Sequence, residues 1–122
     1  MKTFLCCGMV LIGLLLAGNA FADGNRLLEQ CTNAVNYADG ARKIDYEKLG
    51  FCLGFMQGLT NMNQLYEVSL DRKNVLFCTP REVTNGQLAR VVVKYLKEHP
   101  EDLHLHEATL AIAAFVEAFP CK

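Results

Sequence analysis

Residues 50–59, which read GFCLGFMQGL, constrain the fold of this chain more than any other stretch. Gly50, Gly54 and Gly58 recur at every fourth residue, so on a helix they line one ridge where another backbone can come close. Each glycine inside a helix costs about 1 kcal/mol relative to Ala. The sequence therefore predicts either close helix contact along this ridge, which would recover the cost, or a stretch that is not helical.

The apolar residues of the same region decide in favour of a helix. They recur at alternating steps of three and four residues, as on one side of an amphipathic helix. We expect a central helix over residues 45–68, with a buried seam beside the glycine ridge. The predicted seam consists of Cys52, Phe55, Leu59, Met62 and Tyr66.

Three more helices follow from capping residues and helix stops. Asp23 or Asn25 can cap the first helix, and Gly40 can end it. The pattern Thr84-Asn85-Gly86-Gln87 has the form of a capping box, and His99-Pro100 ends the helix that follows it. Without any strand-like alternation, the sequence predicts an all-α fold, a small four-helix bundle stapled by two disulfides. The additional helices are expected at residues 23–38, 84–98 and 106–119.

The N-terminal segment has the features of a secretory signal peptide. Lys2 supplies a positive charge, residues 4–16 are an apolar run shorter than a membrane span, and Ala20-Phe21-Ala22 is a small-x-small site. Cleavage after Ala22 would leave 100 of the 122 residues, enough for one compact domain over residues 23–122. We expect an exported chain with no membrane contact after cleavage.

Charge and cysteine content narrow the function classes. Without Lys2 the chain has 11 basic and 13 acidic residues, whereas a nucleic-acid-binding domain normally has a strong basic excess. Four cysteines remain after cleavage, an even number that predicts two disulfides in an oxidising compartment and leaves all three pairings open. Their spacing does not resemble a zinc site. The cysteines concerned are Cys31, Cys52, Cys78 and Cys121.

No catalytic set is visible in the sequence. Ser69 is the only serine, and it has no Gly-x-Ser-x-Gly elbow around it. The glycines of the central helix lack the Lys-Ser/Thr ending of a phosphate loop. His99, His104 and His106 could bind zinc or copper together with nearby carboxylates, but a polar loop between two helices is the favoured interpretation. We therefore expect a protein that is not an enzyme and has no cofactor or metal.

Two polar surfaces are candidates for binding a partner. The first is the loop at residues 69–74, which could project into a cleft, and the second is a basic stripe that could steer an acidic partner. For both surfaces the competing interpretation is an ordinary solvated face. The candidate residues are Ser69, Asp71, Arg72, Lys73 and Asn74 in the loop, and Arg90, Lys94 and Lys97 in the stripe.

Three segments together resemble the Rap/Tai family of periplasmic immunity proteins. They read FCLGFMQG at residues 51–58, FCTP followed by TNGQLARVVVKYLKEHPE within residues 77–101, and AFPC at residues 118–121. The resemblance spans nearly the whole mature chain. It implies a helical, disulfide-bonded periplasmic fold, sometimes dimeric, that binds a peptidoglycan amidase effector of type VI secretion and blocks its cleft.

The family is similar in outline to small periplasmic chaperones of the HdeA type. That similarity implies pairing of Cys52 with Cys78 and of Cys31 with Cys121. It also supplies the alternative function, a periplasmic stress or acid chaperone with no toxin partner. The leading hypothesis remains an immunity protein whose partner is an amidase effector.

Overall fold

The computed structural model describes residues 23–69 and 74–122, and within these ranges the fold is all-α. Within the described residues, four α-helices and one short 3-10 helix follow one another. The described residues contain no strand, only an isolated bridge between Asp23 and His106. The four-helix, disulfide-bonded prediction is therefore confirmed. The helices are α2 (Gly24–Ala38), α3 (Tyr46–Ser69), α4 (Asn85–Glu98), η2 (Pro100–Asp102) and α5 (Glu107–Ala118). The predicted signal peptide, residues 1–22, lies outside the described residues.

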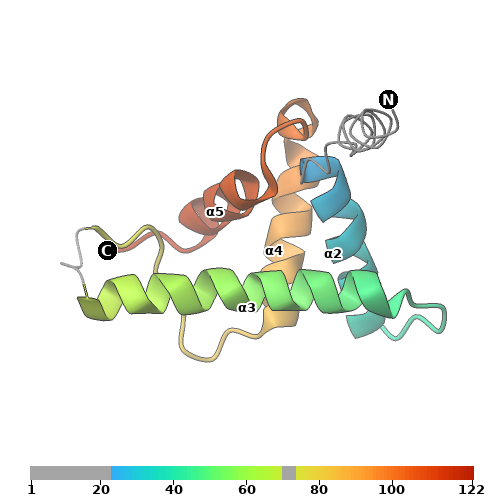
Figure 1. Cartoon of the computed structure of the whole chain (residues 1–122), viewed down its shortest axis with the longest axis horizontal. Coiled ribbons are helices and arrows are strands. Elements are labelled where there is room, and N and C mark those ends of the chain that lie inside the picture. Colours follow the sequence, from blue (N-terminus) through green and yellow to red (C-terminus); the bar gives the residue numbers. More distant parts are fainter. Residues whose placement is uncertain (1–22, 70–73) are drawn as a thin grey trace, which may run out of the picture.

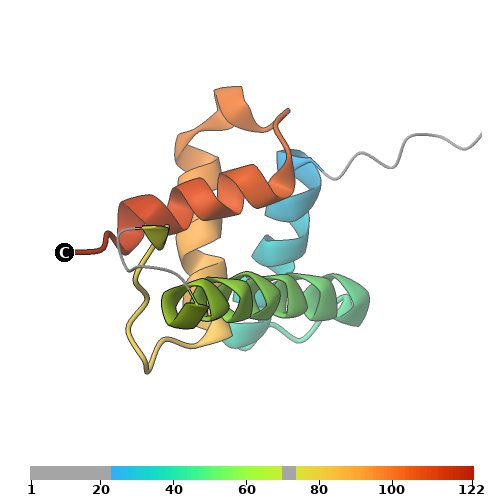
Figure 2. The same cartoon turned by 60° about the vertical axis from the view of Figure 1, so that its left-hand side comes forward.

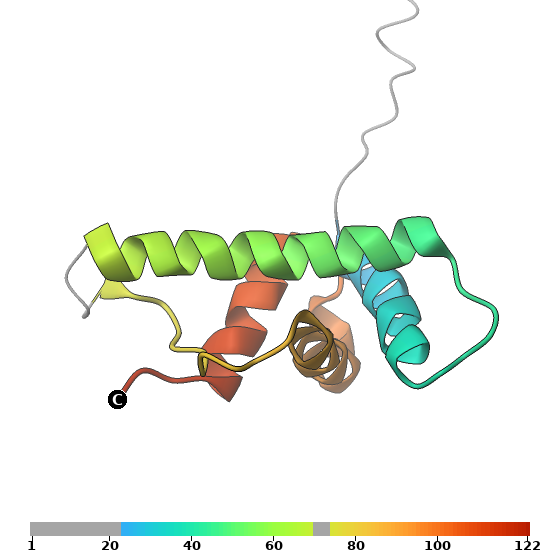
Figure 3. The ribbon, with the colours of Figure 1, turned by 90° about the horizontal axis from the view of Figure 1, so that it is seen from below.

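The long helix α3 lies across a layer formed by the other three helices (Figures 1 and 3). Helix α2 packs against both α3 and α4, and α4 also packs against α5. Figure 2 shows α5 crossing above α3 on the side away from α2. One face of α3 therefore looks into the molecule, while the opposite face has no described helix over it.

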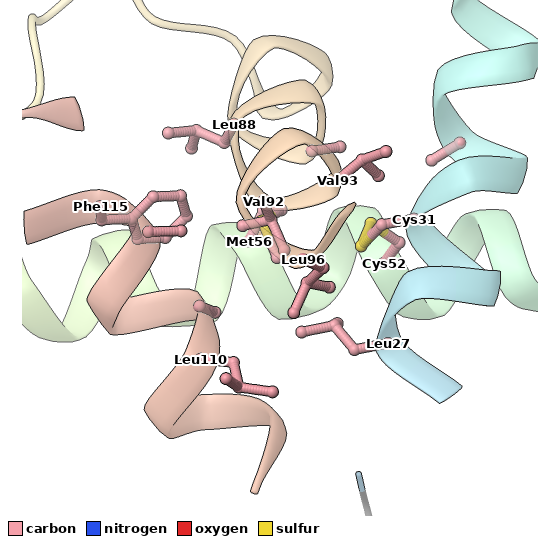
Figure 4. Close-up of a cluster of buried hydrophobic side chains, with 14 of the residues drawn as sticks. Leu27, Cys31, Cys52, Met56, Leu88, Val92, Val93, Leu96, Leu110 and Phe115 are labelled. Atoms are coloured by element: carbon pink, nitrogen blue, oxygen red, sulfur yellow. A yellow bond between two sulfur atoms is a disulfide. The ribbon is translucent and has the colours of Figure 1, made fainter. Parts of the chain in front are cut away.

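The core fills the space between α3 and this layer (Figure 4). Leu27 from α2, Met56 from α3 and Leu96 from α4 are completely buried there. Phe115 from α5 and Phe77 from the segment before α4 pack with ring centroids 5.1 Å apart. Burial of such side chains contributes about 1.5–3 kcal/mol each, so this cluster dominates the stability of a domain this small.

The helix ends agree with the capping residues found in the sequence. The Asp23 side chain accepts a hydrogen bond from the Arg26 backbone N–H at 2.9 Å. Thr84 and Gln87 form the predicted capping box. Gly40 follows the C-cap of α2 with φ of 83°, a left-handed conformation that favours glycine.

The prediction for the glycine ridge is wrong in one respect. The segment is helical, yet a Cβ built on Gly50, Gly54 or Gly58 would have no neighbouring atom within 4 Å. The buried strip of α3 is instead Leu49, Cys52, Met56, Thr60 and Asn63. Gly54 comes two residues after Cys52, about 200° further around the helix, so the ridge faces solvent. The second half of the predicted seam is also exposed, with Met62 at 49% and Tyr66 at 41%.

The predicted disulfide pairing is wrong as well. The structure joins Cys31 to Cys52 and Cys78 to Cys121, instead of Cys52 to Cys78 and Cys31 to Cys121. Cys31 and Cys52 meet where α2 crosses the first half of α3 (Figure 4). Phe77, the residue before Cys78, accepts a hydrogen bond from the Asn63 side chain. Asn63 lies about 16 Å further along α3 than Cys52 at the usual helical rise. The length of α3 thus keeps Cys52 and Cys78 apart.

Candidate functional site

A hollow of about 590 Å³ lies beside the last turns of α3. One wall comes from α3 and the other from the segment that leads to α4. Both charged and apolar side chains line it, which suits contact with another protein or a small molecule. The lining residues are Asn63, Gln64, Glu67, Val68, Thr79, Pro80 and Arg81.

Asn63 fastens the second wall to α3. Its side-chain N–H group donates to the Phe77 carbonyl at 2.7 Å, and the residue is only 6% exposed. Its Oδ1 atom is buried and has no hydrogen-bond partner among the described residues. Leaving this acceptor unpaired costs free energy, and because the atom is buried it does not form part of the surface that a partner could contact.

The C-terminal tail holds the same wall from the other side. The Cys78 backbone N–H donates to the Phe119 carbonyl at 2.8 Å, and Cys78 is bonded to Cys121. The Val83 N–H group donates to the Pro80 carbonyl at 3.2 Å, which closes a turn. The hollow is therefore bordered by a wall with fixed backbone geometry.

Neither of the two described candidate residues of the loop is among the residues that line the hollow. Ser69 directly follows the lining residue Val68, and both Ser69 and Asn74 are exposed. The other three candidates of the loop, Asp71, Arg72 and Lys73, lie outside the described residues.

The basic stripe of α4 is exposed, and part of it is already paired. Arg90 forms a two-pronged hydrogen-bonded ion pair with Asp39 at the end of α2. This hydrogen bond lowers the pKa of Asp39 below its usual value. Lys94 is paired with Glu98 at 3.5 Å, and Lys97 is exposed. Lys94 and Lys97 therefore keep more of their charge available to a partner than Arg90 does.

The stripe and Ser69, the described start of the loop, lie beside different parts of α3. Asn85, the first residue of α4, donates to Gln57 in the middle of α3 at 2.9 Å. Ser69 lies about 18 Å further along the helix axis at the usual rise per residue. A partner would have to be large to contact both surfaces at once.

The three histidines have separate roles. His106 caps α5 by accepting from the Ala108 N–H group at 3.2 Å. His104 contacts the Glu101 carbonyl through Nδ1 at 2.9 Å. Only His99 joins a group that could hold a metal ion, in which its ligand atom and those of Glu101 and Asp102 lie within 4.8 Å of one another.

Sequence reasoning missed the wall of the hollow. It assigned no binding role to Asn63 or to the lining residues Thr79, Pro80 and Arg81. A signal was present, because an amide among apolar residues on a core-facing helix normally needs a partner.

Comparison with known proteins gives one match. The family described as Rap1a immunity proteins matches residues 23–121. No curated protein and no solved structure matches the chain, so the likeness to HdeA in outline stays a prediction. Within residues 23–69 and 74–122, no helix is long and apolar enough to cross a membrane. Since the match covers nearly all of the described residues, the chain belongs to the Rap1a immunity protein family.

Proposed function

We propose that this protein is a periplasmic immunity protein that binds a peptidoglycan amidase effector of type VI secretion and occludes its active site. The family match over residues 23–121 carries the proposal. The match begins at Asp23, the first residue after the predicted signal cleavage site. Two disulfides are consistent with an oxidising compartment such as the periplasm. The protein acts by binding and not by catalysis.

The effector binds at the hollow beside the end of α3. Its volume is in the range of protein binding pockets, and its wall is held by Asn63 and by the Cys78–Cys121 bridge. A wall with fixed backbone geometry loses little conformational entropy on binding. Arg81 lines the hollow, and the exposed Ser69 lies next to its lining. A protruding side chain of the amidase would enter the hollow while the surrounding surface covers the amidase cleft.

The exposed lysines of α4 act at longer range. Lys94 and Lys97 would attract an acidic surface of the effector and raise the association rate, an effect that salt screens. Arg90 contributes less because Asp39 already neutralises it.

An inhibition assay tests the proposal. The oxidised protein, purified from the periplasm, is mixed with the amidase encoded beside its gene, and peptidoglycan cleavage is measured. We expect complete inhibition at equal stoichiometry. An amidase that stays fully active in tenfold excess of this protein would contradict the proposed function.

A pair of charge reversals tests the surface. Arg81→Glu should weaken binding at least tenfold, because it reverses the charge of a lining residue. Arg42→Glu makes the same change on an exposed residue before α3, at the opposite end of that helix, and should leave inhibition unchanged. Equal effects of the two variants would show that the hollow is not the binding surface.

A further inference from the structure

The two disulfides of the chain differ in their surroundings. Cys31 and Cys52 are completely buried and join two helices in the core (Figure 4). Cys78 and Cys121 are both exposed, and they join two segments that are not helical, the one that leads to α4 and the C-terminal tail. Thiol–disulfide exchange begins when a thiolate attacks a disulfide sulfur, so access decides which bridge can react.

A cavity of about 190 Å³ lies directly beside the exposed bridge. A water molecule takes up about 30 Å³ of the liquid, so this volume leaves room for an incoming thiol group. The buried bridge has no exposed surface, and a thiolate could reach it only after the helices around it had opened. The residues that line the cavity are Glu67, Val75, Cys78, Cys121 and Lys122.

The chain is held tightly just before the exposed bridge. Phe77 is 2% exposed, and its ring packs against that of Phe115. Its carbonyl also accepts the hydrogen bond from Asn63 on α3. These contacts do not involve the bridge, so the segment up to Phe77 should keep its place when the bridge is open.

The chain just after the bridge depends on it more strongly. Residues 79–81 line the hollow, and they follow Cys78 directly. The bridge to Cys121 and the hydrogen bond from the Cys78 N–H group to the Phe119 carbonyl connect this wall to the C-terminal tail. Opening the bridge removes the covalent half of this connection and leaves a single hydrogen bond that a short tail can easily lose.

We propose that the Cys78–Cys121 bridge is a reversible redox site, which a dithiol reductant opens while the chain stays folded. A thiolate of the reductant attacks one sulfur of the bridge and forms a mixed disulfide, and the other sulfur leaves as a thiolate. The second thiol of the reductant then attacks the mixed disulfide and releases the remaining cysteine. Two electrons and two protons pass to the chain, which gains two thiols, and the reductant becomes a disulfide.

Reduction at this site loosens one wall of the hollow and leaves the core intact. The buried Cys31–Cys52 bridge still joins α2 to α3, and Phe77 still holds the start of the wall. The redox state of the surroundings thereby controls the shape of the hollow. An effect on effector binding rests on the proposed function, whereas the opening of the bridge and of the wall is measured on the protein alone.

Timed reduction tests the first part of the proposal. The oxidised protein is treated with dithiothreitol, free thiols are blocked with iodoacetamide, and peptide mapping identifies the opened bridge. We expect Cys78 and Cys121 to react at least about a hundredfold faster than Cys31 and Cys52. Dilute urea should not change the faster rate, because the attack requires no unfolding. The singly reduced chain should keep its helical circular dichroism, and oxidised glutathione should close the bridge again.

Limited proteolysis tests the loosening of the wall without any reductant. In a chain with Cys78→Ser and Cys121→Ser, trypsin should cleave after Arg81 at least about tenfold faster than in the oxidised native chain. Arg42, which is exposed before α3, is the internal control, and cleavage after it should stay at the native rate. Gly24→Ala destabilises the chain away from the wall through a clash with Leu110, and it should leave cleavage after Arg81 close to the native rate.

Three results would overturn the proposal. The first is reduction of both bridges at the same rate, or of Cys31–Cys52 first. The second is a singly reduced chain that has lost its helical signal. The third is cleavage after Arg81 that is no faster in the serine variant than in Gly24→Ala. Inhibition of the amidase by the native chain and its sensitivity to Arg81→Glu are measured separately, so the proposed function can fail while the redox site stands.

Discussion

Replacing the glycines of α3 by alanine should stabilise the monomer. Gly54 is exposed, and a Cβ at this position would meet no atom within 4 Å, so alanine causes no clash. Alanine has a helix propensity about 0.8–1 kcal/mol better than that of glycine. The same holds for Gly50 and Gly58, and the triple alanine variant should gain about 2–3 kcal/mol of unfolding free energy if the three sites are independent. For a domain of this size we expect a rise in melting temperature of roughly 10–20 °C.

The measurement is urea unfolding of the oxidised protein at about 0.5 µM, a dilution at which association between copies would add little to the measured stability. Gly24→Ala is the matched control, because the same substitution is made at a helical glycine that is buried. A Cβ there would clash with the Leu110 Cδ1 atom and would lie 2.9 Å from the Leu103 carbonyl oxygen. The control should therefore lose about 1–3 kcal/mol through overpacking.

Two results would refute the reasoning. If Gly54→Ala destabilises the dilute monomer, the ridge packs against another part of its own chain and the outer face of α3 is assigned wrongly. If Gly24→Ala and Gly54→Ala change the free energy of unfolding by the same amount, helix propensity alone explains both effects. The close packing at Gly24 would then make no measurable contribution to stability.

Three further predictions concern the disulfides, a helix cap and acid stability. Replacing Cys78 and Cys121 together by alanine removes a bridge between residues 43 apart and should cost about 2–4 kcal/mol, while non-reducing peptide mapping of the native chain should find these two residues linked. Thr84→Ala removes one half of the capping box and should cost about 1 kcal/mol in urea unfolding, and an unchanged midpoint would contradict this role. The hydrogen bond from Arg90 lowers the pKa of Asp39 below its unfolded-state value of 3.8. The Asp39–Arg90 pair therefore stabilises the fold fully above pH 3.8, and this contribution is lost as the pH falls through the lower pKa of the folded state. Asp39→Asn should therefore flatten the loss of stability in this acid range, and a pH profile identical to that of the native chain would contradict the ion pair.

The helices could be predicted closely because their signals are local. Asp23, Thr84 and Pro100 act within one turn of the helix ends that they define, and each predicted boundary agrees with the structure within about one residue. The disulfides could not be predicted in this way, because pairing depends on where helices cross in space. Cys31 and Cys52 lie on neighbouring helices, and consecutive elements are usually in contact, a general rule that would have favoured the observed pair over the one taken from a similar fold.

The hollow beside α3 illustrates a second limit. Its walls come from residues 63–68 and 79–81, which are separated by a segment with no helical periodicity. The sequence does not indicate that the Asn63 side chain donates to the Phe77 carbonyl. A side-chain to backbone hydrogen bond between residues 14 apart depends on the path of the chain between them. The residues that line the hollow were therefore assigned to a helix face and a turn, and none of them was named among the predicted contact residues, of which Ser69 directly follows the lining residue Val68.

The three glycines of α3 show that a sequence can reveal a loss of helix propensity without revealing which contact, if any, compensates for it. The segment that contains Gly50, Gly54 and Gly58 is helical as predicted, but the close helix contact expected along these glycines is absent among the described residues. Cys52 decides the matter, because its bond to Cys31 fixes which side of α3 faces α2 and thereby turns the glycines outward. A chain that folded only for its own stability would carry alanine or charged residues on that outer face. Three glycines on a solvent-facing ridge therefore lower the helix propensity of α3 with no compensating contact among the described residues, which is why alanine at these positions should raise the stability of the folded chain.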